Sequence, residues 1–117
     1  MAYRIRIFEH EDADALADLA VRAIRTIGPR AYSPEQVAAW CARHGRAERY
    51  IEREGEGQLI LVTVDEADRP CAYALLERDG HLDHLYCDPD HTRQGLAESL
   101  LAKAEIAARD AGVTRLY

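Results

Sequence analysis

The chain has 117 residues, of which 48% are hydrophobic, so it can bury the core of one domain but not of two. Its 15 basic and 21 acidic residues give a formal net charge of -6, which argues against general binding to nucleic acid or to anionic lipid. The sequence contains no apolar run of about 18 residues, the length needed to cross a bilayer, and residues 1–10 are too polar for a signal peptide. We expect a cytoplasmic protein with one domain over residues 1–117.

The first half of the chain is predicted to be mainly helical. Residues 3–8 alternate and include β-branched side chains, which is typical of a strand. Apolar side chains then recur at helical spacing over residues 12–27, until a Gly-Pro pair stops them. The sequence Ser-Pro-Glu-Gln at 33–36 is a capping box and predicts a second helix that ends near residue 45. A further helical segment is expected over 46–54.

The second half is predicted to be a three-stranded antiparallel meander followed by a helix. Apolar, β-branched runs over 58–65, 70–77 and 81–87 are separated by short polar turns, which favours hairpin connections. Residues 95–111 place leucine and alanine on one helical stripe, and the glycine that follows is suited to end the helix. Residues 113–117 again have β character.

The segment from Leu85 to Ala97 runs from a strand through a short loop into this helix. Gly95 allows the backbone of the loop to approach a ligand closely. The first turn of the helix offers amide N–H groups without intrahelical acceptors, at the positive end of the helix dipole. This arrangement predicts a site for a phosphate or pyrophosphate; the alternative is that Gly95 is only a loop glycine.

The same segment resembles the diagnostic motif of the GNAT N-acetyltransferase superfamily. That motif is Gln or Arg, two residues, Gly, one residue, then Gly or Ala, between a strand and a helix. Here it is Thr92-Arg93-Gln94-Gly95-Leu96-Ala97, which matches at Gly95 and Ala97 and departs at Thr92. Residues 32–40 also resemble the second-helix region of one bacterial subgroup, and the order of elements agrees over essentially the whole chain.

The resemblance implies an α+β fold with a mixed, mainly antiparallel sheet flanked by helices. The helix and β-hairpin that usually close this fold at its C-terminus are expected to be absent. It also implies acetyl-CoA as cosubstrate, with no metal. The pantetheine arm would pair with the fourth strand at Leu85, Tyr86 and Cys87. The pyrophosphate would lie over Arg93, Gln94, Gly95, Leu96, Ala97 and Glu98.

The resemblance further implies a catalytic base on the fourth strand, two or four residues before Leu85. Those positions are Asp83 and His81, and strand alternation predicts that both share a face with Leu85. His81 suits proton transfer near neutral pH, whereas Asp83 suits a water relay or binding of a cation. The alternative is that both face solvent at the start of the strand.

Other reactive side chains receive structural interpretations. Cys41, Cys71 and Cys87 show no C-x-x-C pattern and are predicted to pack as small apolar residues, without disulfides or zinc. The histidines form no H-x-x-x-H pair, so no metal site is expected. Tyr32 and Trp40 would line an acceptor pocket or, alternatively, pack in the core.

The predicted activity is acetyl transfer from acetyl-CoA to a primary amine of a small molecule or protein. The alternative is a catalytically weak acyl-CoA-binding or assembly module of the same fold. A different nucleotide site is disfavoured, because neither a P-loop nor G-x-G-x-x-G is present. Acidic residues at 77, 79 and 83 favour a cationic acceptor. Surface left uncovered in the short fold favours a homo-oligomer, most simply a dimer.

Overall fold

A computed structural model describes residues 2–113 and 115–117. Its elements are β1 (Arg4–Ile7), α1 (Ala13–Ile27), α2 (Pro34–His44), α3 (Ala47–Gly55), β2 (Leu59–Val64), β3 (Pro70–Leu76), β4 (Leu82–Cys87) and α4 (Leu96–Asp110), with three short 3-10 turns between them. Every predicted helix and the first four predicted strands are present, with bounds that differ from the expected ones by a few residues. The α+β class is confirmed.

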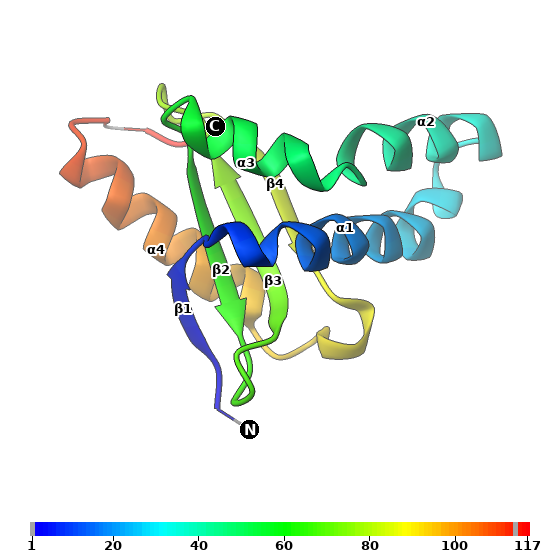
Figure 1. The fold of residues 1–117 in the computed structure, drawn as a ribbon, viewed down its shortest axis with the longest axis horizontal. Coiled ribbons are helices and arrows are strands. Elements are labelled where there is room, and N and C mark those ends of the chain that lie inside the picture. The colour runs from blue at the N-terminus through cyan, green and yellow to red at the C-terminus, as the bar shows by residue number, and fades with distance from the viewer. Residues whose placement is uncertain (1, 114) are drawn as a thin grey trace.

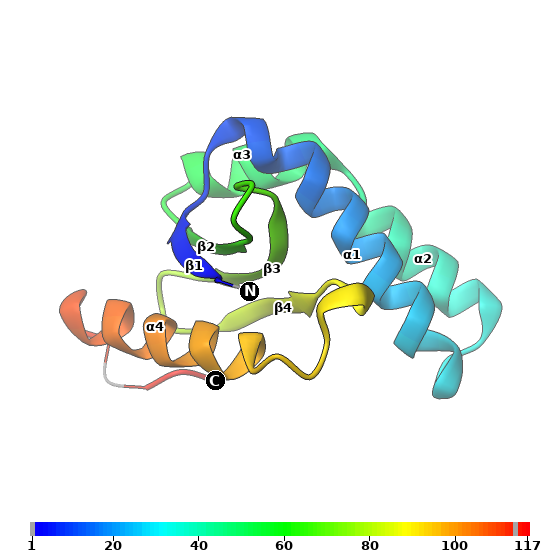
Figure 2. The ribbon, with the colours of Figure 1, turned by 90° about the horizontal axis from the view of Figure 1, so that it is seen from below.

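The four strands form one antiparallel sheet in the order β1-β2-β3-β4. Helices α1, α2 and α3 lie on one side of the sheet and α4 lies on the other (Figures 1 and 2). Two hydrophobic cores therefore share the sheet, because alternate strand residues point to opposite faces. Val62, Tyr73 and Leu75 belong to the core under α1, whereas Ala72 and Ala74 belong to the core under α4.

Each helix buries the stripe that its periodicity predicts. In α1 the side chains of Leu16, Leu19 and Ile24 are fully buried. In α4, Leu100 and Ala104 are fully buried against the small side chains of β3. These small residues let α4 approach the sheet closely, which is consistent with dense packing in protein interiors.

The predicted capping box at the start of α2 is confirmed. The Gln36 N–H donates to the Ser33 hydroxyl oxygen at 3.2 Å, and the Ser33 N–H donates to Gln36 Oε1 at 2.8 Å. Both bonds satisfy amides that a helix start leaves without partners, and Pro34 occupies the first helical position, where no N–H is needed. The two capping bonds fix the residue at which α2 begins. Side chains of α2 contact β4.

The predicted β character of residues 113–117 does not become a strand in the part that the structure describes; Thr114 lies outside it. Tyr117 instead makes one pair of backbone bonds with the start of β4, donating to the Gly80 carbonyl at 3.1 Å and accepting from the Leu82 N–H at 2.7 Å. These two bonds have the pattern found between parallel strands, but they do not continue into a ladder, so residues 115–117 are not a strand.

The cysteine prediction is confirmed in its packing. Cys41 and Cys71 are buried and Cys87 is half-buried, all as free thiols. Burial raises the pKa of the Cys71 thiol to about 11, and burial and the Asp88 charge also raise the pKa of Cys87. Cysteines in such surroundings remain protonated and unreactive near neutral pH. Within residues 2–113 and 115–117, no helix combines the length and apolarity needed to cross a membrane.

Candidate active site

Strand β4 has an outer edge that faces away from β3. The Asp88 N–H donates to the Cys71 carbonyl at 2.8 Å, just beyond the paired residues Ala72 and Cys87. Because antiparallel partners alternate between bonded and non-bonded pairs, the backbone groups of Tyr86 point to β3, whereas those of Leu85 and Cys87 point outward. The pairings of the described residues assign no further strand to this edge. Two of the three residues predicted to pair with pantetheine therefore present free backbone groups.

The loop after β4 is held in an unusual backbone conformation. Arg93 has φ +64° and Gly95 has φ +74°, both in the left-handed region. A non-glycine residue in this region costs of order 1 kcal/mol, and such strain is concentrated at functional loops. A Cβ atom at Gly95 would meet no atom within 4 Å apart from its immediate surroundings in the chain, so the space beside it is open.

The start of α4 completes this side of the site. Gly95 is the N-cap residue and has no side chain with which to cap the first-turn amides. Leu96 is buried and anchors the turn in the core, whereas Gln94 and Glu98 are exposed. The predicted phosphate-binding residues therefore form one continuous turn beside open space, and β4 and α4 lie side by side (Figure 2).

An ion pair ties the beginning of the loop to α1. The Arg22 guanidinium donates two bonds to the Asp88 carboxylate, at 2.9 and 2.7 Å. Burial by itself raises the pKa of Asp88, but bonds from Arg22 and from the Asp90 amide outweigh it and leave this pKa below its ordinary value. The negative charge on Asp88 therefore persists near neutral pH, and the bidentate pair fixes the position where the chain leaves β4.

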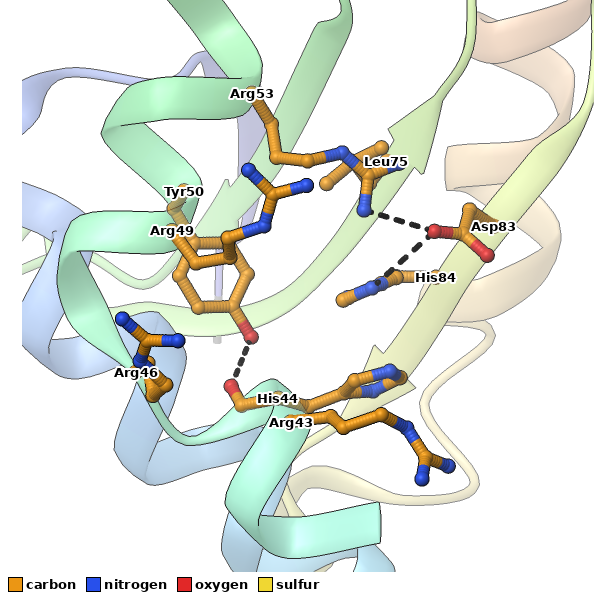
Figure 3. A pocket seen from close by; sticks show the side chains of 9 residues that line it. All are labelled: Arg43, His44, Arg46, Arg49, Tyr50, Arg53, Leu75, Asp83 and His84. Carbon is orange, nitrogen blue, oxygen red and sulfur yellow. Dashed lines mark hydrogen bonds and ion pairs between the residues drawn. The ribbon is translucent and has the colours of Figure 1, made fainter.

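A cavity of about 400 Å³ opens between α2, α3 and β4 (Figure 3). Asp83 and His84 reach it from β4, and Tyr50 reaches it from α3. The Arg53 guanidinium donates to the Asp83 carboxylate at 2.9 Å and orients it. The full lining is Arg43, His44, Arg46, Arg49, Tyr50, Arg53, Leu75, Asp83 and His84.

A β-bulge changes which face Asp83 occupies. His84 pairs with Leu75, but Leu82 pairs with Leu76, so Asp83 is the additional residue of β4. One extra residue reverses the alternation on one side of the bulge. The prediction that Asp83 and Leu85 share a face is therefore wrong: Asp83 lines the cavity beside α3, whereas Leu85 packs in the core under α4.

His81 lies just before β4 and outside the cavity lining. Its Nε2 is 3.6 Å from Asp83 Oδ1 and 3.9 Å from Glu77 Oε1, and its ring packs against that of Tyr117. These contacts place His81 on the other side of the Asp83 carboxylate from the cavity residue His84. The catalytic roles of His81 and Asp83 stay predictions.

The proton positions around His84 follow from its hydrogen bonds. The Tyr50 hydroxyl donates to the His44 carbonyl at 2.6 Å, so its proton is not available for the Tyr73 hydroxyl, 2.7 Å away. Tyr73 must then donate to Tyr50, and its oxygen accepts from His84 Nδ1 at 2.9 Å. In neutral His84 the proton therefore resides on Nδ1. Nε2 keeps its lone pair, 3.6 Å from Asp83 Oδ2.

Burial keeps His84 neutral. Desolvation, followed by repulsion from His44, lowers the pKa of His84 to about 3. Burial by itself raises the pKa of Asp83, but the bond from Arg53 and the nearby positive groups outweigh it, so this pKa lies below its ordinary value. Near neutral pH the cavity therefore presents two adjacent acceptors, a carboxylate oxygen and an imidazole nitrogen. A ligand whose N–H groups donate hydrogen bonds suits the space between the Asp83 carboxylate and His84 Nε2.

A second hydrogen-bonded group supports the other side of the cavity. Trp40 Nε1 donates to the Tyr86 hydroxyl at 2.8 Å, and that hydroxyl lies 2.8 Å from His44 Nδ1. The His44 ring stacks on His84 with centroids 4.0 Å apart. Tyr86 thus uses its side chain to position His44, and Trp40 combines core packing with a place beside Tyr32 at a neighbouring surface hollow.

Three possible metal ligands meet near the start of β4, which spacing in the sequence did not indicate. Ligand atoms of Glu77, His81 and Asp83 lie within 4.8 Å of one another. Arg53 contacts both carboxylates, Glu77 at 3.7 Å and Asp83 at 2.9 Å. This positive charge already compensates them and disfavours a metal cation.

His84 and the arginines of the cavity are the site residues that sequence reasoning missed. From the sequence, His84 was considered only among the histidines that form no H-x-x-x-H pair. The arginines carried a detectable signal, because Arg46, Arg49 and Arg53 are spaced three and four residues apart and helical periodicity gathers such residues on one face.

Comparison with known proteins identifies the family. Residues 29–116 match the model of the acetyltransferase (GNAT) domain. The chain belongs to the GNAT acetyltransferase family. An uncharacterized N-acetyltransferase of Mycobacterium tuberculosis is 30% identical over 110 residues, which cover 91% of this chain and 70% of that protein. The uncharacterized N-acetyltransferase YafP of Escherichia coli is 26% identical and is covered over 62% of its length.

Solved structures confirm the GNAT fold. The PaiA N-acetyltransferase from Thermoplasma acidophilum, in complex with coenzyme A, superposes with a TM-score of 0.86 at 21% identity, covering 97% of this chain and 76% of that chain. A GCN5-related N-acetyltransferase from Rhodopseudomonas palustris gives a TM-score of 0.85 at 27% identity, with 97% and 69% covered. This GNAT chain is accordingly an N-acetyltransferase by family and fold.

Proposed function

We propose that residues 1–117 form a single domain that binds acetyl-CoA and transfers its acetyl group to a primary amine of a small molecule or protein. The observation that carries this proposal is the outer edge of β4, which leads through left-handed residues at Arg93 and Gly95 into the uncapped start of α4. The structurally similar PaiA protein, whose structure contains coenzyme A, supports the choice of cofactor.

The cofactor would use backbone groups at both ends. The pantetheine arm would bond to the outward N–H and C=O groups of Leu85 and Cys87. The pyrophosphate would accept from the amides between Arg93 and Glu98, where the helix dipole favours an anion. An outward N–H of β4 would also polarise the thioester carbonyl.

The acceptor amine would lie between Asp83 and His84. A strand rises about 3.3 Å per residue, so a thioester beside Leu85 would lie within about 7 Å of Asp83 along β4. The carboxylate would hold an N–H of the amine, and His84 Nε2 would accept a proton. His81, on the far side of Asp83, is the alternative base predicted from the sequence.

The chemistry has a balanced sequence of steps. The amine nitrogen attacks the thioester carbon, and the carbonyl oxygen becomes an oxyanion. Bond formation makes the protons on nitrogen much more acidic, so a weak base such as His84 can remove one. The oxyanion then collapses, the C–S bond breaks, and the thiolate of coenzyme A, with an ordinary thiol pKa of about 8.5, takes up the proton that His84 received from the amine, so that His84 returns to its neutral form.

Cofactor binding is tested by thermal unfolding with coenzyme A, acetyl-CoA and phosphopantetheine, which lacks the pyrophosphate. We expect stabilisation by the first two and little by the third, because a ligand that binds only the native state raises Tm. Gly95→Val places a side chain in the open space beside the loop and should abolish the shift. Equal stabilisation by phosphopantetheine would remove the basis for the pyrophosphate site.

Catalysis is tested by following acetyl-CoA-dependent release of thiol over a panel of amines. His84→Asn should lower kcat by about 10²-fold, the lower end of the usual contribution of a general base, because a pKa of about 3 makes His84 a weak base, and acetyl-CoA affinity should be retained. If His81→Asn causes that loss and His84→Asn does not, the base is His81. Tight binding of acetyl-CoA without turnover of any amine would favour the alternative, an acyl-CoA-binding module.

A homodimer is part of the same proposal. Ile7 on the edge strand β1 is 62% exposed and Ile106 on α4 is 51% exposed. Large apolar side chains at such positions favour association with another chain. Sedimentation equilibrium should give twice the chain mass, and a single-chain mass at all concentrations would contradict it.

A further inference from the structure

The cavity beside Asp83 and His84 is basic, although the chain as a whole has a net charge of -6. Four arginines line it: Arg43, Arg46, Arg49 and Arg53. Asp83 is the one carboxylate of the lining. Of the acidic residues that favoured a cationic acceptor at 77, 79 and 83, only this one faces the cavity.

The partners of these arginines divide them into two groups. Arg53 is 12% exposed and is committed to Asp83, Glu77 and Gln58, so it acts as a structural support. Arg46 and Arg49 each contact an exposed glutamate of α3 at 3.2 Å. Exposed pairs of this kind contribute little to stability and are easily exchanged for another anion.

Arg43 differs from the other three. Among the residues that the structure describes, it has no ion pair. It lies near the end of α2 and extends beneath His44 in Figure 3, whereas Arg49 extends from α3 above Tyr50. Two guanidinium groups that are not needed for the fold thus border the cavity from different helices.

The two sides of the cavity have opposite chemistry. Asp83 and neutral His84 on β4 accept hydrogen bonds, whereas Arg43 and Arg49 on the helices only donate them. A cavity of about 400 Å³ lies within the size range of small-molecule sites. A small molecule with a cationic end and an anionic end complements both sides, whereas a polyamine complements only one.

We propose that the acceptor is a small amine that also carries an anionic group, a carboxylate or a phosphate, with the amine at Asp83 and His84 and the anion at either Arg43 or Arg49, which border opposite sides of the cavity in Figure 3. This inference rests on the proposed function, because it concerns the same site. It replaces the cationic acceptor that the acidic residues of the sequence favoured.

Matched pairs of amines test the charge preference. L-arginine is compared with agmatine, L-tyrosine with tyramine, and phosphoethanolamine with ethanolamine, so each pair differs by one anionic group. We expect the anionic member of at least one pair to have a kcat/KM at least tenfold higher. The first two pairs identify a carboxylate and the third identifies a phosphate. Equal rates within all pairs, or preference for the decarboxylated members, would overturn the inference.

Variants locate the anion. One of the two variants Arg43→Gln and Arg49→Gln should raise KM for the preferred anionic amine by about ten- to hundredfold, the size expected for a lost hydrogen bond to a charged group, and it identifies the arginine that holds the anion. Neither variant should change KM for the partner amine that lacks the anionic group by more than about twofold. Arg109→Gln on α4, where the guanidinium is 72% exposed, is the matched control and should change neither value. Unchanged KM in both cavity variants would refute the assignment.

A binding measurement separates this inference from the proposed function. Imidazole NMR signals of His44 and His84 are followed as each amine is added to the unmodified chain. Shifts with the anionic amines alone, reduced by Arg43→Gln or by Arg49→Gln, support the inference even if acetyl-CoA neither binds nor reacts, a result that would refute only the proposed function. Acetyl transfer without such selectivity would refute only the inference.

Discussion

The buried, neutral state of His84 predicts that the domain loses stability in mild acid. The perturbation is a change from pH 7 to pH 5. In the unfolded chain the pKa of a histidine is about 6.5, and in the native state burial lowers that of His84 to about 3. Over this interval the unfolded chain takes up about 0.7 of a proton on His84 that the native state excludes. Stability is therefore fully present above pH 6.5 and is lost as pH falls toward 3.

The size of the effect follows from the two pKa values. With one pKa unit equal to 1.36 kcal/mol, His84 alone lowers the free energy of unfolding by about 2 kcal/mol between pH 7 and pH 5. Burial lowers the pKa of His44 too and adds a loss of the same sign. The lowered pKa values of Asp83 and Asp88 act mainly below pH 4, where carboxylates protonate, so they contribute little in this interval.

Urea unfolding at pH 7 and pH 5 measures this loss. His84→Asn keeps an amide donor near the Nδ1 position that serves Tyr73, and it should reduce the pH-dependent loss to below about 1 kcal/mol. His10→Asn, at a side chain that is 63% exposed, is the matched control and should retain the wild-type loss. Equal stability of the wild type at both pH values would refute the reasoning. So would an imidazole NMR signal of His84 that titrates near pH 6 in the native protein.

Three further predictions concern single contacts. Arg22→Met leaves the Asp88 carboxylate without its partner and should lower the free energy of unfolding by about 1–3 kcal/mol, measured in urea, because Arg22 is itself 42% exposed and solvent screens the pair; a loss below about 0.5 kcal/mol would contradict the role of this pair. Ser33→Ala removes the acceptor for the Gln36 amide and should cost about 1 kcal/mol, with an unchanged midpoint as the contrary result. Gly95→Ala forces a side chain into φ +74° and should cost about 1 kcal/mol while the protein still folds, because the space is open; circular dichroism and urea unfolding check both statements.

Local sequence patterns were sufficient to predict most of the separate helices and strands. Alternation defined the strands, the stripe of Leu100 and Ala104 defined α4, and Ser33 with Gln36 defined where α2 begins. The loop before α4, where we propose that the pyrophosphate binds, was also visible, because Gly95 between a strand and a helix is a local signal. The second left-handed residue, Arg93, was not, since no local rule requires an arginine in that conformation.

The candidate site depended on longer-range geometry. Alternation along β4 failed at Asp83 because the bulge is produced by pairing with β3, and an isolated strand carries no sign of it. His84 became a candidate only when Tyr73, Tyr50 and the His44 carbonyl were seen to fix its proton. Residues this far apart in the sequence are brought together by packing alone.

Local periodicity depends only on residues that are close in the sequence, so the sequence by itself determined the helices, the meander and the loop before α4. The register of β4 on β3 and the position of α2 and α3 over it arise from packing across the whole chain. Only the tertiary structure therefore decided that Asp83 turns toward the helices, that His84 keeps a free lone pair, and that the arginines of an acidic protein line one cavity.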